Sequence, residues 1–264
     1  MPRASAPADG PSARAAAAAD ARRPRVTSRA RVMAPLELGY WAIRGLGAPA
    51  RMMLAHAGAE HADVRYADGP SWFGAKKPAL LERNALANLP YVEDGDVVVS
   101  HSTAVYEYLG VKLGYDDFGS DSEGRFANAQ LLAECYDLRN GLMDVVYPFN
   151  GTTRTTEEFE TNCDGHIKTK CARHLQKFSA WLQARGTKWL VKDTLSSADF
   201  HLWELIDQHE IIAKRRGLPS PLDACPRLQR YYAEFRAEPQ LEKYFSSDAY
   251  TLPMNSIAGG AFIF

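Results

Sequence analysis

The β-strand signals of this chain all fall between residues 36 and 100, and this uneven distribution is the feature that most constrains the fold. Leu36 to Trp41 (LELGYW) has the alternation of a short strand, and Pro49 to Ala57 is predicted as a helix with proline in its first turn. A second strand near Ala62 to Tyr66 follows directly. Because parallel strands need a crossover between them, these segments form a strand, helix, strand unit.

A hairpin and a helix complete this half of the chain. A loop is predicted from Ala67 to Asn88. Pro90 to Glu93 and Val97 to Val99 then flank the turn residues Asp94-Gly95, which is the pattern of a β-hairpin. A helix is predicted from about Thr103 to Leu113.

The order of these elements divides the chain into four parts. Strand, helix, strand, strand, strand, helix is the order of a thioredoxin-like domain, which we place at residues 36–114. An acidic linker is predicted at residues 115–122, after which strand signals vanish and helical periodicity dominates. Residues 123–264 are therefore predicted to be an all-helical domain, and the fold class is α/β plus all-α. Residues 1–35 precede both domains.

The first 35 residues have the composition of a leader or a disordered tail. They are rich in Ala, Pro and Ser and hold seven arginines against Asp9 and Asp20, so they cannot bury a core. The segment resembles an organelle transit peptide, but a disordered tail and a true start at Met33 are equally open readings.

Composition excludes several classes of partner. The 264 residues carry a formal net charge of −1 and no long basic stripe, so no nucleic-acid partner is expected. No apolar run approaches the length of about 20 residues that crosses a bilayer, and no secretory signal is evident. We therefore predict a cytoplasmic protein without a membrane span, or an organellar one if residues 1–35 are a transit peptide. Four scattered cysteines favour reduced thiols.

Two capping boxes predict helix starts in the second half. Thr155 to Glu158 follows a turn at Asn150-Gly151, and Ser196 to Asp199 precedes an apolar helix. By itself a capping box says only that a helix begins there.

One run near the amino end is similar to a known family. Leu38 to Leu46 (LGYWAIRGL) closely resembles the opening strand of mu-class glutathione S-transferases. Four further features follow in that family's order: Asn88-Leu89-Pro90-Tyr91, Ser102 opening a helix, Asp137-Leu138-Arg139, and Ser196 to Asp199 as a buried capping box. The ending Tyr250 to Asn255 looks more like pi-class tails. The resemblance is therefore to the cytosolic, tyrosine-type transferases (mu, pi and sigma).

The resemblance implies an enzyme that joins the glutathione thiolate to hydrophobic electrophiles in detoxification, with glutathione as co-substrate. A free thiol has a pKa of about 8.5, so little thiolate exists near neutral pH. Tyr40 is implied as the catalytic residue, a hydrogen-bond donor that stabilises the thiolate. A donor to the charged form lowers the pKa of the thiol.

Further residues are implied to hold glutathione. Leu89, turned by a cis-Pro90, would pair its backbone with the cysteinyl part, and Trp41 and Asn88 belong to the same set. Ser102 at a helix start would bind the γ-glutamyl carboxylate. His101 departs from the family, which usually has glutamine before that serine, and it brings a titratable group to the site.

Asp137 is implied to act across a homodimer, where it would reach the ammonium of glutathione bound to the partner subunit. Trp72 and Lys76 resemble the tryptophan and lysine that hold the glycyl end. Lys77 is an equally good candidate for that lysine, because the loop aligns poorly.

The electrophile is expected in an apolar pocket beside Tyr40. Tyr147 would face it, and Leu46 and the tail near Met254 would line it.

No metal is expected. Cys163, His166, Cys171 and His174 have zinc-like spacing, but eleven residues of one straight helix span about 16 Å, too far for one tetrahedral ion.

Two alternatives to transferase activity stay open at this point. One is a glutathione-dependent isomerase or peroxidase on the same site. The other is a non-catalytic protein, either a crystallin-like one or a ligand carrier, because a fold by itself does not establish an activity.

Overall fold

The computed structural model of the chain describes residues 35–147 and 155–255, within a compact unit that begins at Ala34. The predicted leader at residues 1–35 therefore lies almost wholly outside the described residues, as does the predicted turn at Asn150-Gly151. The domain boundaries at residues 114 and 122 stay predictions.

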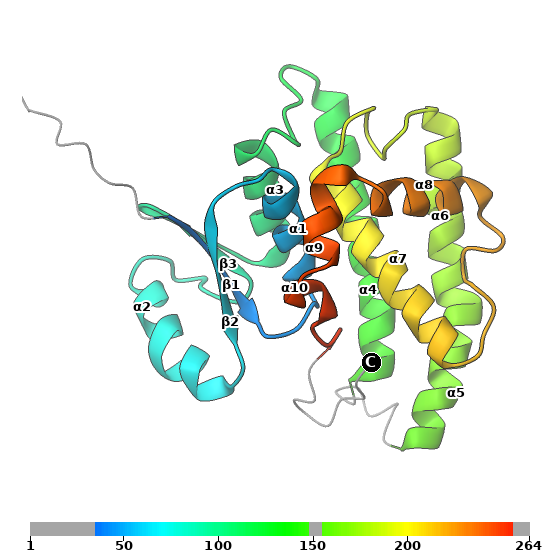
Figure 1. Ribbon diagram of the computed structural model, residues 1–264, viewed down its shortest axis with the longest axis horizontal. Helices are drawn as coiled ribbons and strands as arrows, with labels where there is room; N and C mark the ends of the chain where they lie inside the picture. The colour runs from blue at the N-terminus through cyan, green and yellow to red at the C-terminus, as the bar shows by residue number, and fades with distance from the viewer. Residues whose placement is uncertain (1–34, 148–154, 256–264) are drawn as a thin grey trace, which may run out of the picture. The chain divides into compact units, whose positions relative to one another are not determined.

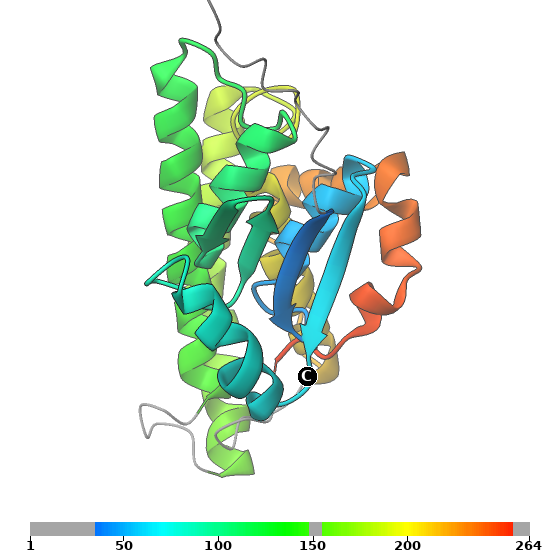
Figure 2. The same cartoon turned by 90° about the vertical axis from the view of Figure 1, so that its left-hand side faces the viewer.

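A four-stranded sheet forms in the order β2-β1-β3-β4 (Figure 2). β1 (Leu36–Trp41) pairs in parallel with β2 (His61–Tyr66) and antiparallel with β3 (Tyr91–Asp94), which pairs antiparallel with β4 (Val97–Ser100). α1 (Ala48–His56) supplies the crossover between β1 and β2. The predicted strand, helix, strand unit and the hairpin are both confirmed, and the thioredoxin-like order of elements with them.

Apolar side chains bind one face of this sheet to helices. Leu36 and Leu38 of β1 are buried in the same core as Met52 and Met53 of α1. α1 packs against α3 (Ser102–Lys112), and both contact α7 (Ser197–Arg215), so the two helices lie between the sheet and the helical half (Figure 1). Side chains on one face of the strand, which recur every second residue, and side chains on one face of each helix, which recur about every 3.6 residues, together form this core.

The segment predicted as a loop between Ala67 and Asn88 contains helical structure instead. η1 (Ser71–Lys76) has π-helical geometry and continues into α2 (Lys77–Leu81) on the other side of the sheet from α1 (Figure 1). The Asp68 side chain accepts a hydrogen bond from the Ser71 amide at 2.8 Å, which starts the helix. Glycine and proline in this stretch mimic a loop signal, whereas burial of Trp72 and Leu80 supplies the stabilising contacts.

The described residues of the second half form helices and connecting segments, with no strand among them, as predicted. α4 and α7 lie side by side, and most residues of α7 are buried. The elements, in chain order, are α4 (Ser122–Val146), α5 (Thr156–His166), η3 (Ile167–Cys171), α6 (Ala172–Arg185), α7 (Ser197–Arg215), α8 (Pro226–Arg236), η4 (Pro239–Leu241), α9 (Glu242–Phe245) and α10 (Asp248–Thr251).

Both predicted capping boxes are present. Thr155 and Glu158 exchange side-chain to backbone hydrogen bonds at the start of α5. At the start of α7, the fully buried Asp199 carboxylate accepts from the Ser196 amide at 2.8 Å and from the Leu190 amide at 2.9 Å. These bonds set the position and the direction of α7, which carries part of the candidate site.

No helix within residues 35–147 and 155–255 combines the length and the apolar character needed to cross a membrane.

Candidate functional site

Tyr40 lies near the carboxyl end of β1 and is 5% exposed. The chain after β1 passes close to this ring. A Cβ at Gly47 would come within 2.6 Å of Tyr40 Cδ1, and one at Gly45, where φ is +36°, within 3.0 Å of the hydroxyl oxygen. Both positions therefore require glycine, because any side chain would displace the tyrosine.

The Tyr40 hydroxyl stays protonated in this environment. Burial raises its pKa, while the charge of Arg139 and a hydrogen bond with the backbone of Leu46 act in the opposite direction. The net shift is upward, so the phenol is neutral near pH 7 and available as a hydrogen-bond donor.

A cavity of about 20 Å³ opens beside Tyr40. Its walls come from the turn after β1, from α4, from α7 and from the end of the described chain. The lining residues are Tyr40, Ile43, Gly45, Arg139, Met143, Tyr147, His201, Leu205, Gln208, Met254 and Asn255. The structure thus brings together Tyr40, Tyr147 and Met254, three residues that the sequence placed in one pocket. Leu46 is not part of this lining.

The tail reaches the cavity through backbone pairing. The Arg44 amide donates to the Pro253 carbonyl at 2.8 Å, and the Gly45 amide donates to the Met254 carbonyl at 3.1 Å. These two bonds hold residues near the end of the chain against the turn that follows β1, and they explain why Met254 lies beside Tyr40.

The predicted glutathione loop and the predicted helix start lie next to each other. The Leu89-Pro90 peptide bond is cis, and the His101 amide donates to the Pro90 carbonyl at 3.1 Å. Asn88 is exposed, whereas Leu89 is half-buried.

His101 and Ser102 form the start of α3. His101 has φ of 70°, a left-handed conformation that is uncommon for residues other than glycine and that tends to occur at functional sites. Ser102 is 3% exposed, and its hydroxyl contacts the Tyr136 hydroxyl from α4. The amides of the first turn of α3 lack helical partners of their own, which suits an anion.

Asp137 points away from the Tyr40 cavity. It lies on the exposed face of α4 and has no hydrogen bond or ion pair within the described part of the chain. Arg139, two positions further along the same helix, lines the cavity instead. The two side chains therefore lie on different faces of α4.

Trp72 and Lys76 both contact side chains of the sheet. Trp72 is 1% exposed and stacks on Tyr91 at 5.8 Å between ring centroids. The Lys76 ammonium lies 2.8 Å from a Glu37 carboxylate oxygen and also pairs with Glu93.

The neighbouring lysine has fewer partners. Lys77 is half-buried, with its ammonium 5.5 Å from the centre of the Phe73 ring, and Phe73 lies 6.0 Å from the Trp41 ring. The structure therefore connects this segment to Trp41, but not to the Tyr40 cavity.

Comparison with known proteins identifies the family. Residues 36–110 match the description "Glutathione S-transferase, N-terminal domain", and residues 136–248 match "Glutathione S-transferase, C-terminal domain". A class-mu 26 kDa glutathione S-transferase (isozyme 1) of Fasciola hepatica is 30% identical over 219 residues, which cover 82% of this chain and 89% of that protein. The chain belongs to the glutathione S-transferase family.

Other relatives and solved structures agree. Glutathione S-transferase Mu 1 of Oryctolagus cuniculus is 29% identical, with 82% of this chain and 93% of that one covered. The crystal structure of the glutathione S-transferase Blo t 8 superposes with a TM-score of 0.69 at 26% identity, covering 83% and 96% of the two chains. The Pi-class enzyme of Onchocerca volvulus has the same fold, with a TM-score of 0.69 at 24% identity over 87% and 100%. These likenesses confirm the predicted fold class.

Sequence reasoning missed several groups that this transferase places around Tyr40. His201, Leu205 and Gln208 share one face of α7 at spacings of four and three residues, a helical pattern that was visible in the sequence. Arg139 lies in the Asp137-Leu138-Arg139 motif, from which the sequence predicts no role for it. The contact of Tyr136 with Ser102 left no signal in the sequence, because 34 residues separate the two.

The residues with zinc-like spacing have other partners in this transferase. His166 Nε2 lies 3.0 Å from His209 Nε2, and His174 Nδ1 lies 2.6 Å from a Glu134 carboxylate oxygen. Within the described ranges, no three His, Cys, Asp or Glu side chains gather closely enough to hold a metal ion.

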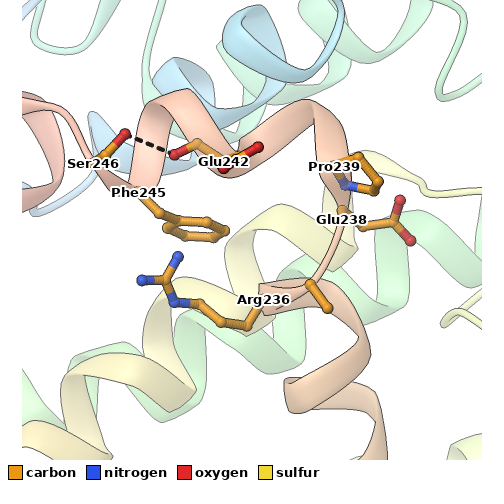
Figure 3. A pocket seen from close by; sticks show the side chains of 7 residues that line it. Arg236, Glu238, Pro239, Glu242, Phe245 and Ser246 are labelled. Carbon is orange, nitrogen blue, oxygen red and sulfur yellow. Dashed lines mark hydrogen bonds between the residues drawn. The ribbon is translucent and has the colours of Figure 1, made fainter.

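A larger hollow of about 490 Å³ lies where α8 turns into η4 and α9 (Figure 3). There the Arg236 guanidinium lies 3.8 Å from the centre of the Phe245 ring, and the Ser246 hydroxyl donates to the Glu242 carbonyl at 2.9 Å. None of the site residues predicted from the sequence lines this hollow, so size alone does not identify the transferase site.

Proposed function

We propose that this chain stabilises the glutathione thiolate with the Tyr40 hydroxyl and adds it to hydrophobic electrophiles. It is a glutathione S-transferase, as its family domains and curated relatives are. The observation that carries the assignment of Tyr40 is its neutral hydroxyl beside a cavity shared by the β1 turn, α4 and α7. The relatives are named as transferases, so the isomerase, peroxidase and carrier alternatives are not favoured.

The chemistry follows from hydrogen bonding to a charged sulfur. The Tyr40 O–H donates to the thiolate, which favours the anion and lowers the pKa of the thiol from about 8.5. The thiolate then attacks an electrophilic carbon. With an aryl halide, a carbon–sulfur bond forms, the carbon–halogen bond breaks and halide leaves. Tyr40 keeps its proton throughout, so it is a donor and not a nucleophile.

We propose partners for the rest of the tripeptide around this centre. Backbone groups of Leu89, beside cis-Pro90, would pair with the cysteinyl unit. The Ser102 hydroxyl and the first amides of α3 would bind the γ-glutamyl carboxylate, with Tyr136 holding the serine hydroxyl in place.

His101, Trp41 and Asn88 flank that path. For the glycyl carboxylate we propose Lys77 or Lys76 near Trp72, and Lys76 would first have to leave Glu37 and Glu93.

The test of the function is turnover of a chromogenic aryl halide by the full chain with glutathione. We expect saturable conjugation well above the uncatalysed rate. A folded protein that binds glutathione yet gives no turnover with aryl halides or with other electrophiles would contradict the transferase proposal and favour a carrier.

We further propose a homodimer in which Asp137 completes the partner subunit's site. Support comes from its place on the exposed face of α4, away from the cavity of its own subunit and without an ion-pair partner among residues 35–147 and 155–255. A carboxylate in that position is available to the ammonium of a glutathione bound to a second copy.

Asp137→Asn is expected to raise KM for glutathione about 10-fold, because a charge-assisted hydrogen bond is worth about 1.5–3 kcal/mol. It should leave kcat nearly unchanged, because Asp137 does not contact the sulfur. Initial-rate kinetics over a range of glutathione concentrations measure both constants. Sedimentation should show the same dimer for the variant and the wild type.

Mixed dimers test which subunit supplies the carboxylate. A dimer of one Tyr40→Phe subunit and one Asp137→Asn subunit has one fully intact site if Asp137 acts across the interface. If Asp137 acts within its own subunit, both sites of that dimer are damaged. We therefore expect the mixed dimer to exceed the mean activity of the two parents at low glutathione, and activity equal to that mean or lower would contradict the proposal.

A further inference from the structure

Among the residues that the structure describes, His201 is a buried polar side chain without a hydrogen-bond partner. It lies near the start of α7, is 1% exposed, and neither ring nitrogen has a hydrogen-bond partner within the described residues. Buried polar atoms in folded proteins are nearly always paired with protein or ordered water. Since the described protein groups leave both nitrogens unpaired, an ordered water is a candidate partner for this ring.

The protein groups nearest the ring do not fill that need. Tyr106 and Tyr136 approach it with ring centroids at 5.1 and 5.6 Å. Their hydroxyls are engaged elsewhere, because Tyr106 donates to the Leu46 carbonyl at 2.7 Å and Tyr136 contacts Ser102. These two rings pack against His201 without forming hydrogen bonds to its ring nitrogens.

His201 lines the cavity beside Tyr40. Its wall also holds Tyr40 itself, Arg139 and Gln208. A volume of about 20 Å³ exceeds the roughly 10–15 Å³ that one water requires, and several polar groups surround it. The site is therefore both large enough and polar enough for a single ordered water.

His201 is neutral in this position. Burial, helped by the charge of Arg139, lowers its pKa to about 3. A neutral imidazole has one N–H donor and one acceptor nitrogen, so it orients a bound water in a definite way.

We propose that one water in this cavity joins a ring nitrogen of His201 to the Tyr40 hydroxyl oxygen, which makes His201 a positioning residue for thiolate stabilisation. This inference rests on the proposed function of Tyr40. A phenol has a single proton. When the water donates to the phenol oxygen, that proton is left for the glutathione sulfur, and the O–H group becomes a stronger donor.

The experiment compares His201→Leu with the wild type and with Tyr40→Phe. Leucine has a similar volume and no polar atom, so it removes the hydrogen bonds without opening a large cavity. The ultraviolet absorbance of bound thiolate, followed against pH, gives the pKa of bound glutathione. We expect His201→Leu to raise that pKa by about half a unit to one unit. At pH values below the pKa, it should lower kcat/KM about 3- to 10-fold.

Two comparisons separate positioning from a structural role. His201→Gln keeps a donor and an acceptor, and we expect it to recover most of the shift. In the Tyr40→Phe background, His201→Leu should add no further shift, because its effect passes through the tyrosine hydroxyl. His201→Met is the second apolar variant should His201→Leu not fold, and the melting temperature is measured for each protein.

The outcomes distinguish a failure of the role proposed for His201 from a failure of the proposed function of Tyr40. If Tyr40→Phe shifts the pKa of bound glutathione but His201→Leu does not, the role of His201 is wrong and the proposed function stands. If the pKa shift caused by His201→Leu adds fully to that caused by Tyr40→Phe, the water-mediated link between His201 and Tyr40 is also wrong. If Tyr40→Phe itself leaves the pKa unchanged, the proposed function fails first.

Discussion

Replacing Tyr40 with phenylalanine is expected to lower kcat/KM for aryl-halide conjugation near neutral pH by about 10- to 100-fold. The substitution removes one oxygen and with it the hydrogen bond to a charged sulfur, which is worth about 1.5–3 kcal/mol. The loss should shrink at high pH, where glutathione ionises without help. A pH–rate profile of kcat/KM, taken with wild type and variant in parallel, measures both effects.

The control for this substitution is stability. Tyr40 is buried and its hydroxyl bonds to the backbone of Leu46, so the variant loses at most one neutral hydrogen bond in the fold, about 1 kcal/mol. Urea unfolding should show a small change only. Equal loss of activity at neutral and high pH would contradict thiolate stabilisation and would assign Tyr40 a purely structural role.

Replacing Arg44 with alanine is expected to lower the free energy of unfolding by about 3–5 kcal/mol. The Arg44 guanidinium is buried and donates to Glu204 at 3.0 and 2.7 Å and to Asp207 at 2.6 Å. Without it, two buried carboxylates on α7 repel each other with no cation between them. Urea or thermal unfolding, with the m-value checked for constancy, measures the loss.

Arg230→Ala is the matched control for Arg44→Ala. Arg230 is 73% exposed and pairs with Glu234 one turn along α8, an arrangement worth about 0.3–0.5 kcal/mol. We expect the two alanine variants to differ by at least about 2 kcal/mol. A loss for Arg44→Ala as small as that for Arg230→Ala would show that α7 adjusts easily to the missing cation.

Arg44 also links stability to the site. Its amide pairs with Pro253, and the next residue, Gly45, borders the Tyr40 cavity. The ion pairs with Glu204 and Asp207 therefore fix the turn after β1 against α7, from which His201 faces the same cavity. Loss of Arg44 is expected to disturb the geometry around Tyr40 as well as the fold.

Local signals in the sequence were enough to predict the order of elements. The strand, helix, strand unit and the hairpin appeared within one or two residues of their predicted positions, because strand alternation, helical periodicity and glycine or proline at the ends are properties of neighbouring residues. Both capping boxes were predicted for the same reason, since their bonds span three residues. Misreading residues 67–88 as a loop shows the limit, because burial of Trp72 and Leu80 overrides local propensity there.

Local patterns and motifs are enough to predict the family, the two kinds of structure in the chain and Tyr40 as the first candidate for catalysis. What surrounds that tyrosine follows only from the packing of distant segments. Arg44 meets Glu204 across 160 positions of the chain, and His201 reaches the Tyr40 cavity from a different half of the molecule. Lys76 pairs with Glu37 and Glu93 rather than standing free. Such contacts depend on how whole helices and sheets pack against one another, and the periodicity of one segment does not tell which distant segment it meets.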